Sequence, residues 1–138
     1  MTEERCIFCE IIAGAIHAAV VYEDEESIAF LDITPINHGH VLVVPKHHSR
    51  NIFDARHETL APLMRSVQKI AHAVRAGTGA EGINIHMNNE SAAGQAVFHT
   101  HIHIIPRFHE DGIVMWKGHP YSDGEMQKLA TQIKTALL

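Results

Sequence analysis

The stretch HTHIHII, residues 99–105, places three histidines at alternate positions. Alternate side chains of a β-strand point to the same face, whereas in a helix this spacing would scatter them around the axis. The β-branched residues between the histidines favour a strand, and we expect Pro106 to end it. The three imidazoles then form one row, with Thr100, Ile102 and Ile104 on the opposite face. Groups that titrate near neutrality are costly beside a core, so the row indicates chemistry.

Two chemistries could use such a row of histidines. Alternate imidazoles on a strand can converge on one catalytic metal ion. Alternatively, one imidazole is a nucleophile, and its neighbours set its tautomer and stabilise the developing charge. The covalent alternative needs an anion-binding loop beside the strand. The segment AAGQAV, residues 92–97, has small residues that let backbone N–H groups face a ligand, and Gln95 adds a side-chain donor.

The bulk composition is that of one small soluble domain. The chain has 138 residues, of which 46% are apolar and 20% are charged. Its formal charge of −5 provides no large basic surface, so we expect no specific nucleic-acid binding. No apolar run has membrane-spanning length, and the polar N-terminus does not resemble a signal peptide. We therefore expect a cytoplasmic protein with no membrane partner.

The hydrophobic pattern predicts an α+β fold with a mostly antiparallel sheet. Apolar residues at three- and four-residue spacing predict a long helix, and strands cluster around it in the sequence. A final helix begins after Ser122 or Asp123, with an apolar inner side at Met126, Leu129, Ile133 and Leu137. The expected elements are a helix at 7–13, strands at 20–23, 28–31 and 40–44, the long helix at 56–77, a strand at 82–88 and the histidine strand.

Both cysteines lie in one short motif, Cys6-Ile7-Phe8-Cys9. Three interpretations are open: a redox pair, half of a zinc site, or two small buried side chains. A thioredoxin-like redox site would follow a strand and open a helix in a βαβ unit, and no such unit is predicted here.

The segment NNESAAGQAVFHTHIHIIPR, residues 88–107, resembles the signature of the histidine triad (HIT) family, His-φ-His-φ-His-φ-φ with φ apolar. Thr100 stands at the first φ position. The segments CIFC (6–9), AFLDI (29–33) and GHVLVVPKHH (39–48) also resemble this family, most of all its bacterial Hint-like branch. The resemblance implies a single HIT domain over residues 1–138. Its fold would be a five-stranded antiparallel sheet carrying one long helix, with short N- and C-terminal helices, and it would form a homodimer.

The resemblance also implies an activity, the hydrolysis of nucleoside 5′-phosphoramidates or related AMP and GMP derivatives at the α-phosphorus. His101 matches the nucleophile that forms a covalent nucleotidyl-histidine intermediate. His99 and His103 match the outer members of the triad, and His103 contacts the phosphate region. His40 matches a fourth histidine near the α-phosphate and the leaving group. Purine nucleotides are the expected substrates.

The remaining nucleotide contacts are implied in the same way. Asp32 matches the carboxylate that accepts hydrogen bonds from the ribose hydroxyls. Asn88, Gln95 and the backbone of Ala96 and Val97 match the phosphate loop. Many relatives have Ser or Thr where this chain has Ala96, so that hydroxyl donor is missing here while the backbone N–H is kept.

A structural zinc ion is the expected cofactor, and the chemistry itself requires no metal. Cys6 and Cys9, together with His48 and His99, form a Cys₂His₂ set suited to tetrahedral zinc. Some bacterial HIT proteins carry zinc at these positions. If His99 is a zinc ligand, it acts only as a scaffold, and His101, His103 and His40 remain for the chemistry.

Several other functions stay open. Within the same superfamily, the chain could hydrolyse dinucleoside polyphosphates or transfer a nucleotidyl group. Outside it, the histidines could ligate the metal of a metal-dependent hydrolase, or the chain could bind nucleotides without catalysis. In Hint-like relatives the C-terminal segment reaches the partner's active site, so Trp116 could shape substrate choice.

Overall fold

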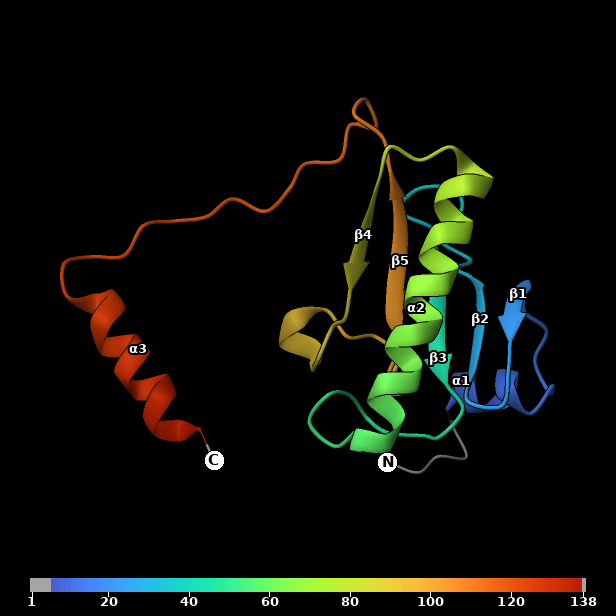
Figure 1. Cartoon of the computed structure of the whole chain (residues 1–138), viewed down its shortest axis with the longest axis horizontal. Helices are drawn as coiled ribbons and strands as arrows, with labels where there is room; N and C mark the ends of the chain where they lie inside the picture. The colour runs from blue at the N-terminus through green and yellow to red at the C-terminus, as the bar shows by residue number, and fades with distance from the viewer. Residues whose placement is uncertain (1–5, 138) are drawn as a thin grey trace.

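The centre of the molecule is a five-stranded antiparallel sheet in the order β1-β2-β3-β5-β4 (Figure 1). The computed structural model describes residues 6–137. The fold class expected from the sequence is confirmed. The strands are β1 (Val20–Glu23), β2 (Ser27–Leu31), β3 (Val41–Pro45), β4 (Gly82–His86) and β5 (Ile102–Arg107).

One long helix covers one face of the sheet, and a short helix lies against the other (Figure 1). The long helix buries Leu63, Val67 and Ile70 against alternate residues of the strands. It is capped at its C-terminus by Gly79, whose φ of 73° is the left-handed conformation that glycine adopts at little cost. The helices are α1 (Ile7–Ile12), α2 (His57–Thr78) and α3 (Glu125–Ala136), with a 3₁₀ turn η2 (Ser91–Ala93).

The two faces of the sheet have different roles. On the α2 face, Ile102 and Ile104 of β5 join the larger hydrophobic cluster. Because side chains alternate along a strand, His103 points to the opposite face, where Phe8 of α1 packs with Phe30 of β2. None of the helices within residues 6–137 is long and apolar enough to cross a membrane.

The histidine strand differs from the prediction at both ends. It begins at Ile102, so His99 and His101 precede it. The N–H of Thr100 donates to the carbonyl of Ser49 at 2.8 Å, which ties this segment to a loop. Pro106 does not end the strand but lies within it, opposite Ile83 of β4. Pairing with β3 stops at Ile104, so the missing N–H of Pro106 lies beyond that ladder.

The C-terminal helix forms, but without the predicted inner side. It begins at Glu125, after Gly124, and extends away from the body on a long connection (Figure 1). Met126, Leu129 and Ile133 are all exposed, by 62%, 37% and 64%. The apolar stripe was predicted from its period, but nothing in the described part of the chain covers it.

Candidate active site

A concave pocket opens on the sheet face opposite α2. His101 and His103 form part of its wall, and residues of the loop between β4 and β5 form another part. Asp32, at the end of β2, stands beside them, and one of its carboxylate oxygens accepts the N–H of Thr34 at 2.9 Å. Of the predicted nucleotide-binding residues, the pocket is lined by Asp32, Asn88, Ala96, Val97, His101 and His103.

The hydrogen bonds of His101 fix its tautomer. Its Nδ1 lies 2.7 Å from the carbonyl oxygen of His99, and a carbonyl only accepts. Nδ1 therefore carries the proton, and the lone pair of the neutral ring is on Nε2. Phe8 packs its ring edge-on against this imidazole at a centroid distance of 5.1 Å, which restricts its rotation. A neutral imidazole held in this way has the lone pair that a nucleophile requires.

His40 fixes the tautomer of His103 by a similar route. The N–H of Ile36 donates to Nδ1 of His40 at 3.1 Å, so the proton of neutral His40 is on Nε2. Nε2 then donates to Nδ1 of His103 at 2.9 Å and lies 3.7 Å from a carboxylate oxygen of Asp32. His103 in turn carries its own proton on Nε2. This arrangement gives the pocket an N–H donor beside the lone pair of His101, since the two rings are 4.9 Å apart.

Burial keeps these imidazoles neutral. It lowers the pKa of His101 and of His40 from the ordinary value of 6.5. Burial also lowers the pKa of His103 to about 4, and the neighbouring imidazoles of His101 and His40 add to this effect. At neutral pH each of these three imidazoles therefore has one protonated nitrogen and one nitrogen with a lone pair.

The loop after β4 supplies backbone donors next to His101. Within residues 6–137, the N–H groups of Ala96 and Val97 have no protein acceptor. Both residues line the pocket, and such N–H groups can bind a phosphate oxygen. Gln95 is different. Its side chain is buried, with 4% exposed, and its amide donates to the carbonyls of Arg50 and Val97. Gln95 therefore supports the loop from behind and does not line the pocket.

The apolar part of the pocket was not predicted from the sequence. One side of α1 and the connection after it supply it, together with Phe30 and Leu31 of β2. A period-based search assigns such side chains to the core, because nothing in their spacing distinguishes a pocket wall. The additional apolar lining residues are Ile7, Phe8, Ile11, Ile16, Ala18, Phe30, Leu31, Ile33 and Leu42.

The four predicted zinc ligands meet in a second, separate cluster. Cys6, at the N-terminus of α1, and Cys9, within it, converge on His48 and His99, and their ligand atoms lie within 4.8 Å of one another. Nδ1 of His99 is 3.4 Å from the sulfur of Cys6 and 3.1 Å from Nδ1 of His48. Burial lowers the pKa of His99 to about 4. His99, predicted as an outer member of the catalytic triad, thus lies in this cluster and does not line the pocket.

The cluster has the donors of a tetrahedral metal site. Nε2 of His99 donates to the carbonyl of Pro45 at 2.7 Å, which leaves the lone pair of Nδ1 directed at the other ligands. Two thiols and two imidazoles with this orientation suit zinc. A bound ion would supply a structural clamp between α1 and the segment before β5.

Fold and site together define a class of protein: an antiparallel α+β domain in which neutral histidines and open backbone N–H groups meet in one pocket. The chain belongs to the HIT family, whose HIT domain model matches residues 13–110. It is 44% identical to "Protein hit" of Bacillus subtilis, over 97% of this chain and 95% of the relative. It is 37% identical to "Adenosine 5′-monophosphoramidase hnt1" of Schizosaccharomyces pombe, over 96% and 98% of the two chains.

Solved structures agree in fold. A HIT family protein from Bacillus subtilis matches with a TM-score of 0.88 and 42% identity, over 97% of this chain and 98% of that chain. A zinc-bound histidine triad family protein from Mycobacterium smegmatis matches with a TM-score of 0.77 and 36% identity, over 99% and 100% of the two chains. The family predicted from the histidine motif is therefore confirmed.

Proposed function

We propose that this protein hydrolyses nucleoside 5′-phosphoramidates, and related AMP or GMP derivatives, by attack of His101 on the α-phosphorus. The observation that carries the proposal is the hydrogen bond from Nδ1 of His101 to the carbonyl of His99, which places a lone pair on Nε2. The phosphoramidase activity in the name of the fission-yeast relative supports the same chemistry.

The other groups of the pocket suit the remaining steps. As the bond from Nε2 of His101 to phosphorus forms, the bond to the leaving group breaks. The open N–H groups of Ala96 and Val97 stabilise the charge on the equatorial oxygens. Neutral His103 has an Nε2 proton that can hydrogen-bond to the phosphoryl group, and the departing amine takes up its proton from solvent water. Water then cleaves the histidine–phosphorus bond and releases the nucleoside monophosphate.

Other groups of the pocket suit a nucleoside. The carboxylate of Asp32 can accept hydrogen bonds from the ribose hydroxyls. The apolar wall formed by Ile7, Ile11 and Leu31 can hold a flat purine base. Phosphoramidates rank first as substrates because an amine leaves as a neutral molecule once protonated. Dinucleoside polyphosphates rank second, and nucleotidyl transfer is a related alternative.

The decisive experiment is a substrate panel with intact-mass detection of an adduct. Adenosine 5′-phosphoramidate, adenylated lysine and diadenosine polyphosphates are each mixed with the protein and quenched in base, which preserves a phosphohistidine. We expect turnover and an AMP adduct that maps to His101, and His101→Asn should abolish both while AMP still binds. No adduct and no turnover across the panel would refute the proposal.

A metal-dependent hydrolase is the rival of another class, since ligand atoms of Asp32, His40 and His103 also lie within 4.8 Å of one another. The geometry disfavours a metal there. The N–H of Ile36 points at Nδ1 of His40, so Nε2 carries the proton and has no lone pair for a metal. Turnover that is lost with a chelator and restored by one metal ion, at constant protein stability, would favour the rival.

Zinc at the Cys/His cluster is proposed as a structural cofactor. The zinc-bound family member from Mycobacterium smegmatis supports it, as do the four converging ligands, Cys6, Cys9, His48 and His99. The measurement is metal content per chain after purification without added metal. One zinc per chain in the wild type and much less in Cys9→Ser is expected.

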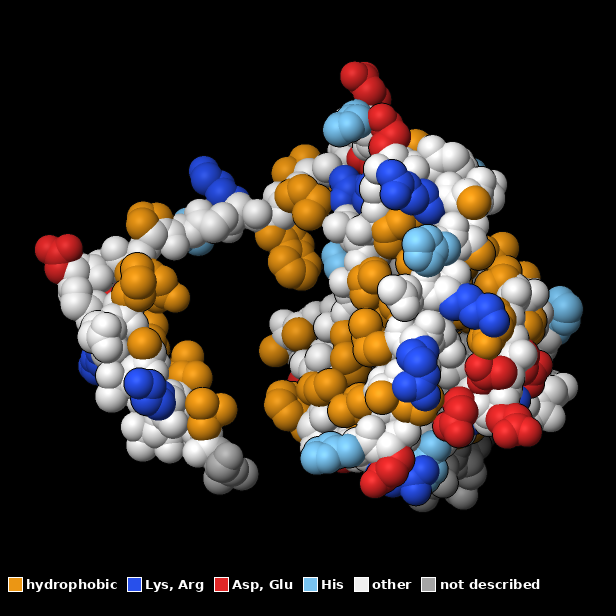
Figure 2. All heavy atoms as spheres, viewed as in Figure 1, with side chains coloured by type: hydrophobic (Ala, Val, Ile, Leu, Met, Phe, Trp, Pro, Cys, Tyr) orange, Lys and Arg blue, Asp and Glu red, His pale blue; other side chains and the backbone are white. Residues whose placement is uncertain are grey.

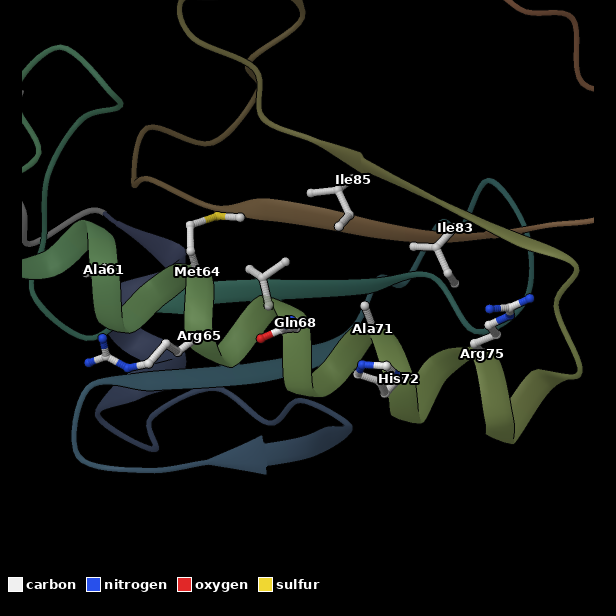
Figure 3. Close-up of a pocket in the computed structure, with 10 residues that line it drawn as sticks. Ala61, Met64, Arg65, Gln68, Ala71, His72, Arg75, Ile83 and Ile85 are labelled. Atoms are coloured by element: carbon white, nitrogen blue, oxygen red, sulfur yellow. The ribbon is translucent and has the colours of Figure 1, made fainter.

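We also propose that the protein is a homodimer. A shallow groove lies between α2 and β4, an edge strand of the sheet (Figure 3). Met64 of α2 and Ile85 of β4 point toward it and are about half exposed, at 49% and 47%. In Figure 2 the hydrophobic side chains of α3 face hydrophobic side chains of the body across an open gap. The residues that line the groove are Ala61, Met64, Arg65, Val67, Gln68, Ala71, His72, Arg75, Ile83 and Ile85.

A second copy of the chain suits both surfaces. A 12-residue helix is marginal on its own in water, so α3 needs a surface to pack on. The start of its connection is fixed, because Arg107 donates two hydrogen bonds to Asp111. In a two-fold dimer, each groove meets the same groove of the partner, and each α3 can cover the partner's apolar surface.

Sedimentation equilibrium tests the dimer. Ile85→Arg in the groove and Ile133→Lys on α3 should each shift the protein to the monomer. Val21→Lys on β1, at the opposite edge of the sheet, is the matched control and should leave the dimer intact. A wild-type monomer at micromolar concentration would contradict the proposal, and loss of a larger assembly would indicate a different partner arrangement.

A further inference from the structure

The backbone of Glu90 has an unusual conformation at the start of the loop that lines the pocket. Its φ is 76° and its ψ is 159°, a region that is essentially confined to glycine. It is the single non-glycine residue with positive φ among residues 6–137. Strained residues persist only where the surrounding structure determines them, and they concentrate at functional sites. The contacts of Glu90 therefore need an explanation.

The carboxylate of Glu90 is held by two residues of another loop. Nε and Nη2 of Arg50 donate to its two oxygens at 2.9 and 2.8 Å, as a bidentate pair. The side-chain amide of Asn51, with 1% exposed, donates to the same carboxylate at 2.7 Å. These contacts lower the pKa of Glu90 to about 2, so it is ionised at neutral pH. Bidentate charged pairs fix orientation as well as distance.

The backbone of Glu90 is held as well. Its N–H donates to the side-chain oxygen of Gln95 at 2.8 Å, and its carbonyl accepts the N–H groups of Ala93 and Gln95. The buried amide of Gln95 then reaches the carbonyls of Arg50 and Val97. Every polar atom of that amide is therefore used within the chain.

The far end of the loop is tied to the same arginine. The guanidinium of Arg50 lies over the ring of Phe98, 4.2 Å from its centroid. Arg50 thus contacts residues on both sides of the open N–H groups of Ala96 and Val97. Neither Glu90 nor Arg50 lines the pocket, so any effect they have on a ligand acts through the loop.

We propose that Glu90 is a positioning residue for nucleotide binding: the Arg50–Glu90 pair, with Gln95, forces the loop into the shape that presents the N–H groups of Ala96 and Val97 to the phosphate. This rests on the proposed nucleotide site. The strained backbone is the consequence of that shape. Without the carboxylate the turn relaxes, and the two donors lose their common direction.

Three substitutions at one position separate the side chain from the backbone. Glu90→Ala removes the carboxylate but keeps a Cβ, which disfavours this backbone conformation. Glu90→Gly removes the carboxylate and that conformational penalty, and Glu90→Gln keeps an oxygen acceptor for Arg50. Glu23→Gln is the matched control, because it removes the negative charge from the exposed Glu23–Lys46 pair, which has a similar distance of 2.8 Å but lies away from the loop.

The first measurement is AMP affinity by calorimetry, beside thermal stability. We expect the Kd to rise about tenfold in Glu90→Ala and Glu90→Gly, about 1.4 kcal/mol, less in Glu90→Gln and not at all in Glu23→Gln. Glycine normally destabilises a protein relative to alanine. Here Glu90→Gly should have the higher Tm of the two while binding AMP equally weakly. An alanine variant that binds AMP like the wild type, or that melts above the glycine variant, would overturn the proposal.

The second measurement is amide hydrogen exchange without nucleotide. The amides of Ala93 and Gln95, which donate to the carbonyl of Glu90, should exchange at least about tenfold faster in Glu90→Ala. Unchanged exchange at these two amides would refute the role of the Glu90 carboxylate in shaping the loop, whatever ligand the pocket binds. If the wild type itself binds no AMP, the proposed function fails, and the exchange data still decide whether Glu90 shapes the loop.

Discussion

A buried pair of hydroxyls links the two histidine clusters, and its removal has a calculable cost. The hydroxyls of Ser49 and Thr100 lie 2.6 Å apart, with 5% and 1% of the residues exposed. Thr100 stands between His99 of the Cys/His cluster and His101 of the pocket. The hydroxyl of Thr100 also donates to the carbonyl of Ser49 at 3.3 Å. Among residues 6–137, the Thr100 hydroxyl thus has two hydrogen-bond partners, whereas the Ser49 hydroxyl has only Thr100.

This difference in partners predicts which substitution lowers the free energy of unfolding more. Thr100→Val leaves the buried hydroxyl of Ser49 without a partner, which costs about 1–3 kcal/mol. Ser49→Ala leaves Thr100 with its carbonyl acceptor, so the cost is about 0.5–1.5 kcal/mol, the net worth of one hydrogen bond. The double variant has no orphaned hydroxyl, and its cost should fall below the sum by about 1 kcal/mol.

Equilibrium urea unfolding measures all four proteins, with equal metal content verified for each. The midpoints should shift while the slope m stays constant. The reasoning is refuted if Ser49→Ala is the more destabilising single variant, or if the two costs add within the error of the measurement.

Three further predictions concern protons, metal and catalysis. Burial lowers the pKa of His103 from 6.5 to about 4 in the folded protein. As the pH falls from 6.5 to 4, His103 therefore becomes protonated in the unfolded chain but stays neutral in the folded protein. The free energy of unfolding should decrease over that window and less steeply in His103→Asn; equal slopes would contradict this. A chelator or Cys9→Ser should lower the Tm, yet the metal-free protein should still form the His101 adduct below that Tm, as mass spectrometry would detect. His40→Asn should lower kcat about 10- to 100-fold by releasing the tautomer of His103; an unchanged kcat in quenched-flow assays would remove His40 from the mechanism.

The periodic parts of this fold could be predicted from the sequence. The three- and four-residue spacing of Leu63, Val67 and Ile70 locates α2 within one residue of its observed ends. The apolar run of β3 marks a central strand that is buried throughout. Such patterns are readable because burial imposes the period of the element itself.

Contacts between distant segments could not be read from spacing. Gln95 is a polar residue in a loop, which suggested a ligand contact, but its amide is consumed by backbone carbonyls 45 and 2 residues away in the sequence. The contacts of Glu90 with Arg50 had no sequence signal, since Arg50 lies 40 residues away and belongs to no motif. The apolar stripe of α3 is correct in period, but a period does not say which surface will cover it.

The two-residue spacing between His99 and His101 is explained by a hydrogen bond and not by sheet geometry, because Nδ1 of His101 bonds to the carbonyl of His99. A side chain that bonds the carbonyl two residues earlier closes a small hydrogen-bonded ring, and that ring sets the separation between the two histidines. The carbonyl that fixes the tautomer of His101 thus belongs to His99, whose own ring faces the sulfurs of Cys6 and Cys9. One residue inserted between His99 and His101 would break the hydrogen-bonded ring and turn His99 out of its cluster at once. The segment from His99 to His101 therefore fixes the geometry of the Cys/His cluster and of the pocket together. Insertions there should be far less tolerated than single substitutions at Thr100.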